Sequence, residues 1–138
     1  MYYISQKKNS QIPHTWFFFN PTIISKKKIF YKISNKNGVI FFFENHEIDN
    51  FFRLIKPYVV WCKKKKIKFI IPYSIHWANK YKAFGILIDS KCRKKIKDKN
   101  FKFLKKKFFF VSKVHNFKEA LNIKNFVDFV FLTPVFKT

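Results

Sequence analysis

Short, wholly apolar runs recur along the chain, and longer segments of mixed or strongly basic character separate them. Each run is apolar throughout and does not alternate with polar side chains, which is typical of strands covered on both faces, as in parallel sheets. Proline or glycine stands at the boundary of several runs and marks where a strand begins or ends. The pattern predicts six strands, at residues 16–19, 39–43, 68–71, 86–88, 108–111 and 129–132.

The segments between these runs carry helical signals. After His46, apolar side chains recur at spacings of three and four, which predicts one helix face. Pro57 falls inside this pattern and is expected to kink or end the helix. Residues 91–107 are so basic that the pattern favours a solvated helix or loop without choosing between them.

Two further helices have recognisable capping residues. Ser74 is expected to cap a helix that ends just before Gly85, since serine accepts hydrogen bonds at helix starts and glycine tolerates the left-handed conformation at helix ends. Asn116 is expected to cap a later helix, and Glu119, three residues on, completes the pattern of a capping box.

Strands that alternate with helices predict right-handed βαβ units and a parallel sheet. We therefore expect one α/β domain over residues 1–138, either an open doubly wound sheet or a parallel (βα) barrel of TIM type that is incomplete, with about six βα units. Residues 20–22, Asn-Pro-Thr, follow the first strand where a dinucleotide-binding domain would carry a glycine-rich loop.

The chain is strongly basic, with 30 Lys plus Arg against 7 Asp plus Glu and a net charge of +23. One interpretation is a nucleic-acid-binding protein. The other is codon drift in an A/T-rich genome, which would raise Lys, Phe, Ile and Asn together; the 21 Phe favour it. Lysine runs such as Lys63–Lys66 also suit a solvated helix end. The charge still predicts weak, salt-sensitive and nonspecific binding to polyanions.

Other features bear on the compartment. Cys62 and Cys92 are isolated and lack the spacing of a metal or redox motif, which favours a reduced, cytoplasmic chain. Residues 1–11 lack the apolar core of a signal peptide. None of the apolar runs approaches the length of a membrane-spanning helix, so we expect no membrane association.

Polar residues follow three of the predicted strands where each ends. They are Asp89 after the fourth strand, Ser112 and His115 after the fifth, and Thr133 after the sixth. Parallel strands all end at the same edge of a sheet, and ligands bind at that edge. Taken singly, each of these residues also fits a turn or a helix cap, and Asp128 is expected to close the turn before the sixth strand.

Two blocks near the end of the chain carry a family resemblance. They are Val-Ser-x-x-His-Asn at residues 111–116 and Asp-Phe-Val-Phe-Leu-Thr-Pro-Val-Phe-x-Thr at residues 128–138. With the order of the earlier apolar runs, they resemble the thiamine phosphate synthase family, including its TenI-like relatives. That family has a (βα)8 barrel. Its synthases join a hydroxymethylpyrimidine diphosphate to thiazole phosphate and release diphosphate with the help of Mg²⁺.

The resemblance also implies roles for particular residues. Ser112 matches a serine beside the reacting substrates, and His115 is expected to assist it in catalysis. Thr133, Thr138 and Asn116 are expected to contact the phosphorylated substrates. For Mg²⁺, which takes one or two carboxylates together with substrate phosphate oxygens, the nearest candidate ligand is Asp89.

The chain departs from the family at several positions. Residues 41–44 stand where the family carries a diphosphate-binding arginine, Pro72–Tyr73 replace an Asn-Asp pair, and no seventh or eighth βα unit follows. The resemblance therefore implies a truncated or degenerate member, and it leaves open whether the chain is an enzyme. Two alternatives stay open beside it: a small basic nucleic-acid-binding protein, and an inactive remnant completed by a partner, as in a homo-oligomer.

Overall fold

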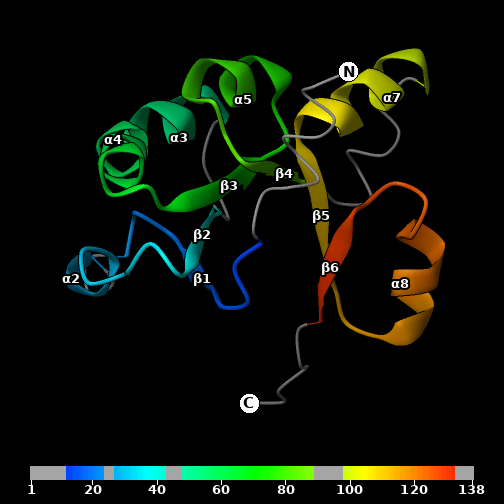
Figure 1. Ribbon diagram of the computed structural model, residues 1–138, viewed down its shortest axis with the longest axis horizontal. Helices are drawn as coiled ribbons and strands as arrows, with labels where there is room; N and C mark the ends of the chain where they lie inside the picture. The colour runs from blue at the N-terminus through cyan, green and yellow to red at the C-terminus, as the bar shows by residue number, and fades with distance from the viewer. Residues whose placement is uncertain (1–11, 24–26, 43–47, 89–97, 133–138) are drawn as a thin grey trace. The chain divides into compact units, whose positions relative to one another are not determined.

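The computed structural model describes residues 12–23, 27–42, 48–88 and 98–132 (Figure 1). The chain divides into two compact units, which we call the first unit (residues 11–84) and the second unit (residues 85–138). Among the residues described, no helix has the length and apolar character needed to cross a bilayer.

The first unit is built on a parallel sheet of three strands in chain order. The strands are β1 (Trp16–Phe19), β2 (Gly38–Phe41) and β3 (Lys68–Pro72). Its helices are α2 (Lys27–Phe30), α3 (Ile48–Leu54), α4 (Lys56–Lys65) and α5 (Ile75–Tyr81). Helix α4 packs on β3 and contacts α3, so helices connect successive strands and cover one face of the sheet.

The second unit repeats this arrangement. Its strands are β4 (Gly85–Leu87), β5 (Phe109–Val114) and β6 (Phe129–Leu132), again parallel and in chain order. Its described helices, α7 (Asp98–Lys107) and α8 (Phe117–Ile123), both pack against β5. The strands pair in parallel within each unit, as the wholly apolar runs predict.

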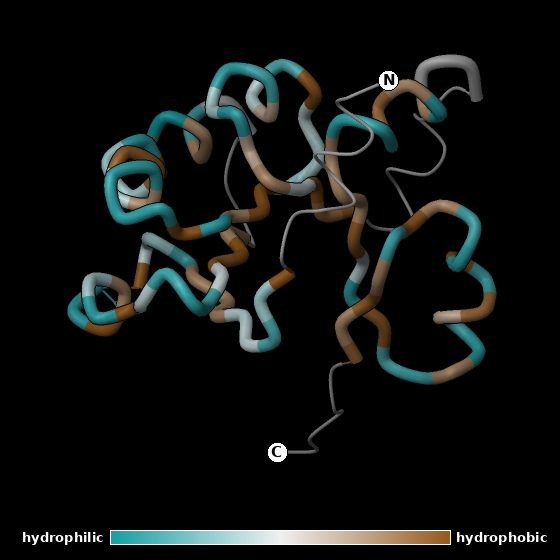
Figure 2. The backbone as a smooth tube through the Cα atoms, viewed as in Figure 1, coloured by the Kyte–Doolittle hydropathy of each residue, from teal (hydrophilic) through white to brown (hydrophobic). Residues whose placement is uncertain are grey.

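Aromatic rings fill the space between the first sheet and its helices. Phe19 of β1 lies 4.7 Å from Phe30 of α2 and 5.0 Å from Tyr58 of α4, between ring centroids. Phe41 of β2 joins the same group, 6.1 Å from Phe30. The strands are mainly brown in Figure 2, and the long teal stretches lie on helices such as α4. Many of the phenylalanines therefore serve as core.

On the opposite face of the first sheet, the packing of Trp16 requires glycine at position 38. A Cβ atom at Gly38 would collide with the ring of Trp16, which lies over this position. The indole Nε1 of Trp16 donates to the carbonyl of Pro13 at 2.8 Å, which fixes the ring there. Glycine is thus needed at position 38 because the Trp16 ring approaches so closely. A left-handed backbone is not the reason, since the φ angle of Gly38 is not positive.

The helix predicted after His46 is broken as expected, although His46 itself lies outside the described residues. The structure has two helices, α3 and α4, with Ile55 between them, and Pro57 lies in the first turn of α4. Proline is tolerated there because the first N–H groups of a helix have no intrahelical partner. The short helix α2 was not predicted.

The capping predictions are right at the helix starts and wrong at one end. Ser74 Oγ accepts a hydrogen bond from Trp77 N at 3.3 Å. Helix α5 ends at Lys82, whose φ of 55° is left-handed, and Gly85 instead begins β4. Asn116 Oδ1 accepts from Glu119 N at 2.8 Å, which confirms the predicted cap of α8.

Candidate functional site

The strands of each parallel sheet end at one edge, which we call the carboxyl edge. In the first unit, Asn20 follows β1 and is 7% exposed. Its Oδ1 atom accepts hydrogen bonds from the backbone N and the Oγ1 atom of Thr22, at 3.0 and 2.7 Å. After β3, the hydroxyl of Ser74 is engaged in capping α5. These polar side chains stabilise turns and caps at the carboxyl edge.

The structure corrects the placement of Ser112. The sequence predicted that the fifth strand ends at Val111, with Ser112 just beyond it. Strand β5 instead continues to Val114, so Ser112 lies inside the strand. It is 3% exposed, and its hydroxyl donates to the carbonyl of Ile88 at 2.8 Å. The hydroxyl is thus engaged within the second unit, and its predicted contact with substrate stays a prediction.

The pleat of β5 places Ser112 and Lys113 on opposite faces. Successive side chains in a strand alternate, so Phe110, Ser112 and Val114 share one face. Phe110 stacks on Phe101 of α7 at 5.0 Å, which makes this the face covered by helices. Lys113 is exposed and belongs to the other face, which in a (βα) barrel is the interior.

Replacing Ser112 with alanine is expected to lower the free energy of unfolding by about 1–2 kcal/mol, because the buried carbonyl of Ile88 loses a donor. Urea unfolding followed by circular dichroism measures this change. Thr15→Ala removes an exposed hydroxyl and is the control, expected within about 0.5 kcal/mol of wild type. Unchanged stability of the Ser112→Ala variant, combined with lost ligand binding, would contradict this structural role and favour the predicted direct role at the substrate.

His115 and Asn116 lie together where β5 leads into α8. Both side chains are exposed. The backbone N of His115 donates to the carboxylate of Glu119 at 2.8 Å, while Asn116 caps the helix. The capping box is therefore shifted by one residue, since Glu119 reaches the residue before the cap. With Lys113, these residues form the polar and basic end of β5.

The remaining predicted site residues, Asp89, Thr133 and Thr138, lie outside the described residues. Asp128 confirms its predicted role in the turn before β6, because its carboxylate accepts from Phe110 N at 2.8 Å and its own N donates to Phe110 O at 2.7 Å. Within residues 12–23, 27–42, 48–88 and 98–132 there is no group of three His, Cys, Asp or Glu side chains arranged to hold a metal ion. The Mg²⁺ site that the resemblance implies, with Asp89 as its candidate ligand, therefore stays a prediction.

Cys62 is a buried residue of α4, and burial raises the pKa of its thiol to about 12. As a residue of α4, Cys62 does not lie at the carboxyl edge. Because the thiolate is the reactive form, the thiol is chemically inert in the folded chain.

A pH dependence follows from this pKa. The ordinary thiol pKa is near 8.5, so between roughly pH 8.5 and 12 the folded state holds the Cys62 proton more tightly than the unfolded state. Its contribution to stability is therefore present below about pH 8.5 and is lost as the pH rises. We expect the stability difference between the parent and a Cys62→Ala variant, both carrying Cys92→Ser, to shrink from about pH 8 to about pH 10.5. A constant difference in urea melts would contradict this.

Comparisons with known proteins place the fold. No family model matches the chain, and no curated protein matches it in sequence. Among solved structures it is similar to the thiamine phosphate pyrophosphorylase from Pyrococcus furiosus, with a TM-score of 0.66 and 12% identity. The match covers 90% of this chain and 62% of that one. The chain thus spans less than two thirds of the length of this relative.

This similarity, together with the parallel strands, defines the class of protein. The chain has an α/β fold of the parallel (βα) barrel type, with six strands of an incomplete barrel. The predicted fold class is confirmed. The particular protein that the chain resembles in structure is a thiamine phosphate pyrophosphorylase. Because only 12% of the aligned residues are identical, this similarity shows the fold alone.

Proposed function

We propose that the chain is a thiamine phosphate synthase-like or TenI-like protein that binds a small phosphorylated substrate of thiamine biosynthesis at its carboxyl edge. The observation that carries the proposal is the structural similarity to a thiamine phosphate pyrophosphorylase over 90% of the chain. Parallel (βα) proteins bind ligands at the carboxyl ends of their strands, and the end of β5 is both polar and basic.

Three residues at the end of β5 suit a phosphate group. Lys113 supplies a compact positive charge on the face opposite the helices. The side-chain amide of Asn116 caps α8 through its oxygen, and its nitrogen is a hydrogen-bond donor. The exposed side chain of His115, between them in sequence, adds a ring N–H donor. In this proposal Thr133 and Thr138 extend the same substrate site, as the resemblance to the family implies.

The reaction proposed for this site is a substitution at carbon. The thiazole nitrogen attacks the methylene carbon of the pyrimidine, a carbon–nitrogen bond forms, and the carbon–oxygen bond to diphosphate breaks. Diphosphate leaves with the bonding electrons, and the nitrogen becomes positively charged. Cations near the leaving oxygens stabilise this charge separation. Mg²⁺ would supply the same stabilisation, with Asp89 proposed as its protein ligand.

The proposal is tested with purified protein, thiazole phosphate, the pyrimidine diphosphate and Mg²⁺. We expect thiazole phosphate to raise the melting temperature and thiamine phosphate to form, as detected by mass spectrometry. Lys113→Gln is expected to weaken thiazole phosphate binding about tenfold. Lys118→Gln removes an exposed charge on α8 and is the matched control, with little change expected. No thermal shift and no product would contradict the proposal.

A second candidate function is binding to nucleic acid, favoured by the exposed lysines at the end of α4. Residues 63–66 are all exposed, and Lys65 lies 5.0 Å from the ring of Trp61. Filter binding of RNA over a range of salt decides this candidate. Affinity that survives physiological salt favours a nucleic-acid function, whereas affinity that falls to baseline leaves only nonspecific attraction.

A further inference from the structure

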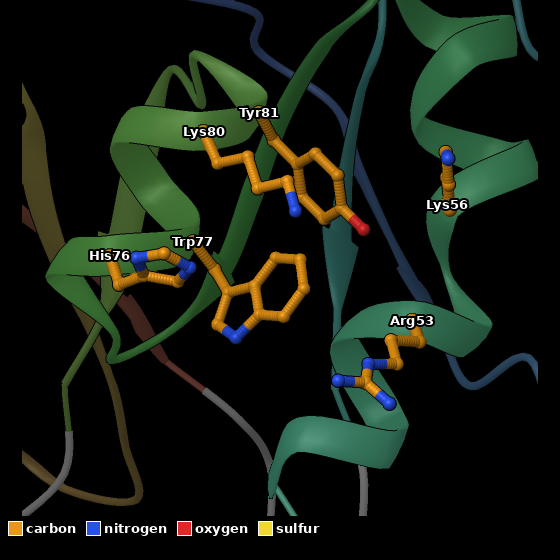
Figure 3. Close-up of a pocket in the computed structure, with 6 residues that line it drawn as sticks. All are labelled: Arg53, Lys56, His76, Trp77, Lys80 and Tyr81. Atoms are coloured by element: carbon orange, nitrogen blue, oxygen red, sulfur yellow. The ribbon is translucent and has the colours of Figure 1, made fainter.

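A basic pocket lies within the helical layer of the first unit, formed by α3, α4 and α5 (Figure 3). Its volume is about 360 Å³, within the range of sites for small ligands. The lining side chains are Arg53, Lys56, His76, Trp77, Lys80 and Tyr81. We call it the helical pocket. It belongs to a different set of elements from the polar end of β5.

The helical pocket gathers positive charge that the described residues do not neutralise. The exposed side chains of Arg53, Lys56 and Lys80 all line it, and within the described residues none of them forms an ion pair. The described side chains of the first unit include no carboxylate. Asp49 precedes Arg53 by four residues, and its side chain lies outside the described part. Like charges that share a pocket repel one another, and an anion bound there removes the repulsion.

The aromatic wall of the helical pocket is firmly held. Trp77 stacks on Phe52 with ring centroids 5.5 Å apart and planes 13° apart. The hydroxyl of Tyr81 donates to the carbonyl of Phe52 at 2.6 Å, and burial raises the pKa of Tyr81, which keeps this donor protonated. Both side chains are under 10% exposed. A wall fixed in this way loses little entropy when a ligand binds.

Lys80 packs against the aromatic wall, and the other two cations lie across the pocket from it. The Nζ atom of Lys80 lies 4.8 Å from the centre of the Trp77 ring. Figure 3 shows Lys80, Tyr81 and Trp77 on one side of the opening, with Arg53 and Lys56 across from them. Arginine binds phosphate through two parallel hydrogen bonds, and lysine supplies a point charge. Positively charged side chains on two sides of the pocket suit a ligand with more than one phosphate group.

We propose that the helical pocket is a binding site for a small diphosphate-bearing ligand, held between Arg53 and Lys56 on one side and Lys80 on the other. The exposed edges of Trp77 and Tyr81 give the pocket an apolar side against which the organic part of such a ligand packs. This site is additional to the carboxyl edge and does not depend on the function proposed there.

The test uses the full chain and pyrophosphate as the probe, titrated at constant ionic strength and followed by calorimetry. The doubly substituted variant Arg53→Gln/Lys56→Gln is expected to bind pyrophosphate at least about tenfold more weakly than wild type. Lys63→Gln/Lys64→Gln removes the same charge from positions of α4 that are also exposed but do not line the pocket, and it is the control. It is expected to change the affinity by less than about twofold. Circular dichroism establishes that both variants are folded.

A second measurement locates the bound probe. The indole Nε1–H resonance of Trp77 is expected to shift on pyrophosphate addition, in step with the calorimetric binding curve. Equal weakening in the two double variants would overturn the proposal, since it would indicate diffuse attraction to net charge. A Trp77 resonance that stays in place at saturation would also overturn it. Thiazole phosphate binding is expected to be unchanged in Arg53→Gln/Lys56→Gln, which keeps this test separate from that of the carboxyl edge.

Discussion

Replacing Phe110 with alanine is expected to lower the free energy of unfolding by about 3–5 kcal/mol, which is a large fraction of the stability of an ordinary domain. Phe110, the second residue of β5, is fully buried, and its ring stacks on Phe101 of α7 at 5.0 Å. Truncation removes this contact and leaves a cavity between the strand and the helix. Urea unfolding monitored by circular dichroism measures the loss.

Two controls separate this effect from the mere removal of a ring. Phe117→Ala deletes the same group from α8, where Phe117 is 76% exposed, and should change stability by less than about 0.5 kcal/mol. Phe110→Leu keeps much of the buried volume and should cost about 1.5 kcal/mol or less. Similar stabilities for Phe110→Ala and Phe117→Ala would mean that α7 does not pack on β5 as described.

Replacing Phe52 with alanine is expected to destabilise the chain by a similar amount, about 3–5 kcal/mol. Phe52 is fully buried, and its ring stacks on Trp77 of α5 while it also contacts Phe51 at 5.6 Å. Its loss removes the support behind the aromatic wall of the helical pocket. Thermal unfolding followed by near-ultraviolet circular dichroism reports both stability and the fixed environment of the tryptophan.

Leu54→Ala is the matched control for this second substitution. Leu54 lies on the same helix, is 38% exposed, and should cost about 1 kcal/mol or less. A Phe52→Ala variant as stable as Leu54→Ala would contradict the packing of α3 against α5. Where Phe52→Ala remains folded, pyrophosphate binding should also weaken, because Trp77 has lost its stacking partner.

The strands were predictable from sequence because both of their faces are covered. In β2, for example, residues 38–41 are all buried, so the strand reads as an uninterrupted apolar run. The end of β5 was missed for the complementary reason. Ser112 is polar although buried, and Lys113 is exposed, so the apolar run stops at Val111 while the strand continues to Val114. Hence the sequence predicts the order and direction of the strands better than their ends.

Helix starts were more predictable than helix ends. Ser74 and Asn116 cap by accepting hydrogen bonds from backbone N–H groups only three positions later, so the local sequence carries the signal. Helix ends usually carry glycine in the left-handed conformation. This chain has two glycines, and Lys66 and Lys82 take that conformation instead, with φ of 59° and 55°. Each costs roughly 1 kcal/mol, and no local signal marks it.

The candidate sites depend on details that a sequence does not fix. A shift of one residue along a strand moves a side chain to the other face, so Ser112 and Lys113 could be distinguished only in the structure. The helical pocket joins three helices, and its residues share no sequence motif.

One measurement tests the central claim most directly, namely that the carboxyl edge around the end of β5 binds a phosphorylated ligand. Thiazole phosphate is titrated into isotopically labelled protein, and the backbone amide resonances are followed by nuclear magnetic resonance. The account predicts saturable shifts centred on Lys113, His115 and Asn116, with little change at Trp77. Absence of any shift at the end of β5, at ligand concentrations that saturate the protein or reach the solubility limit, would contradict it.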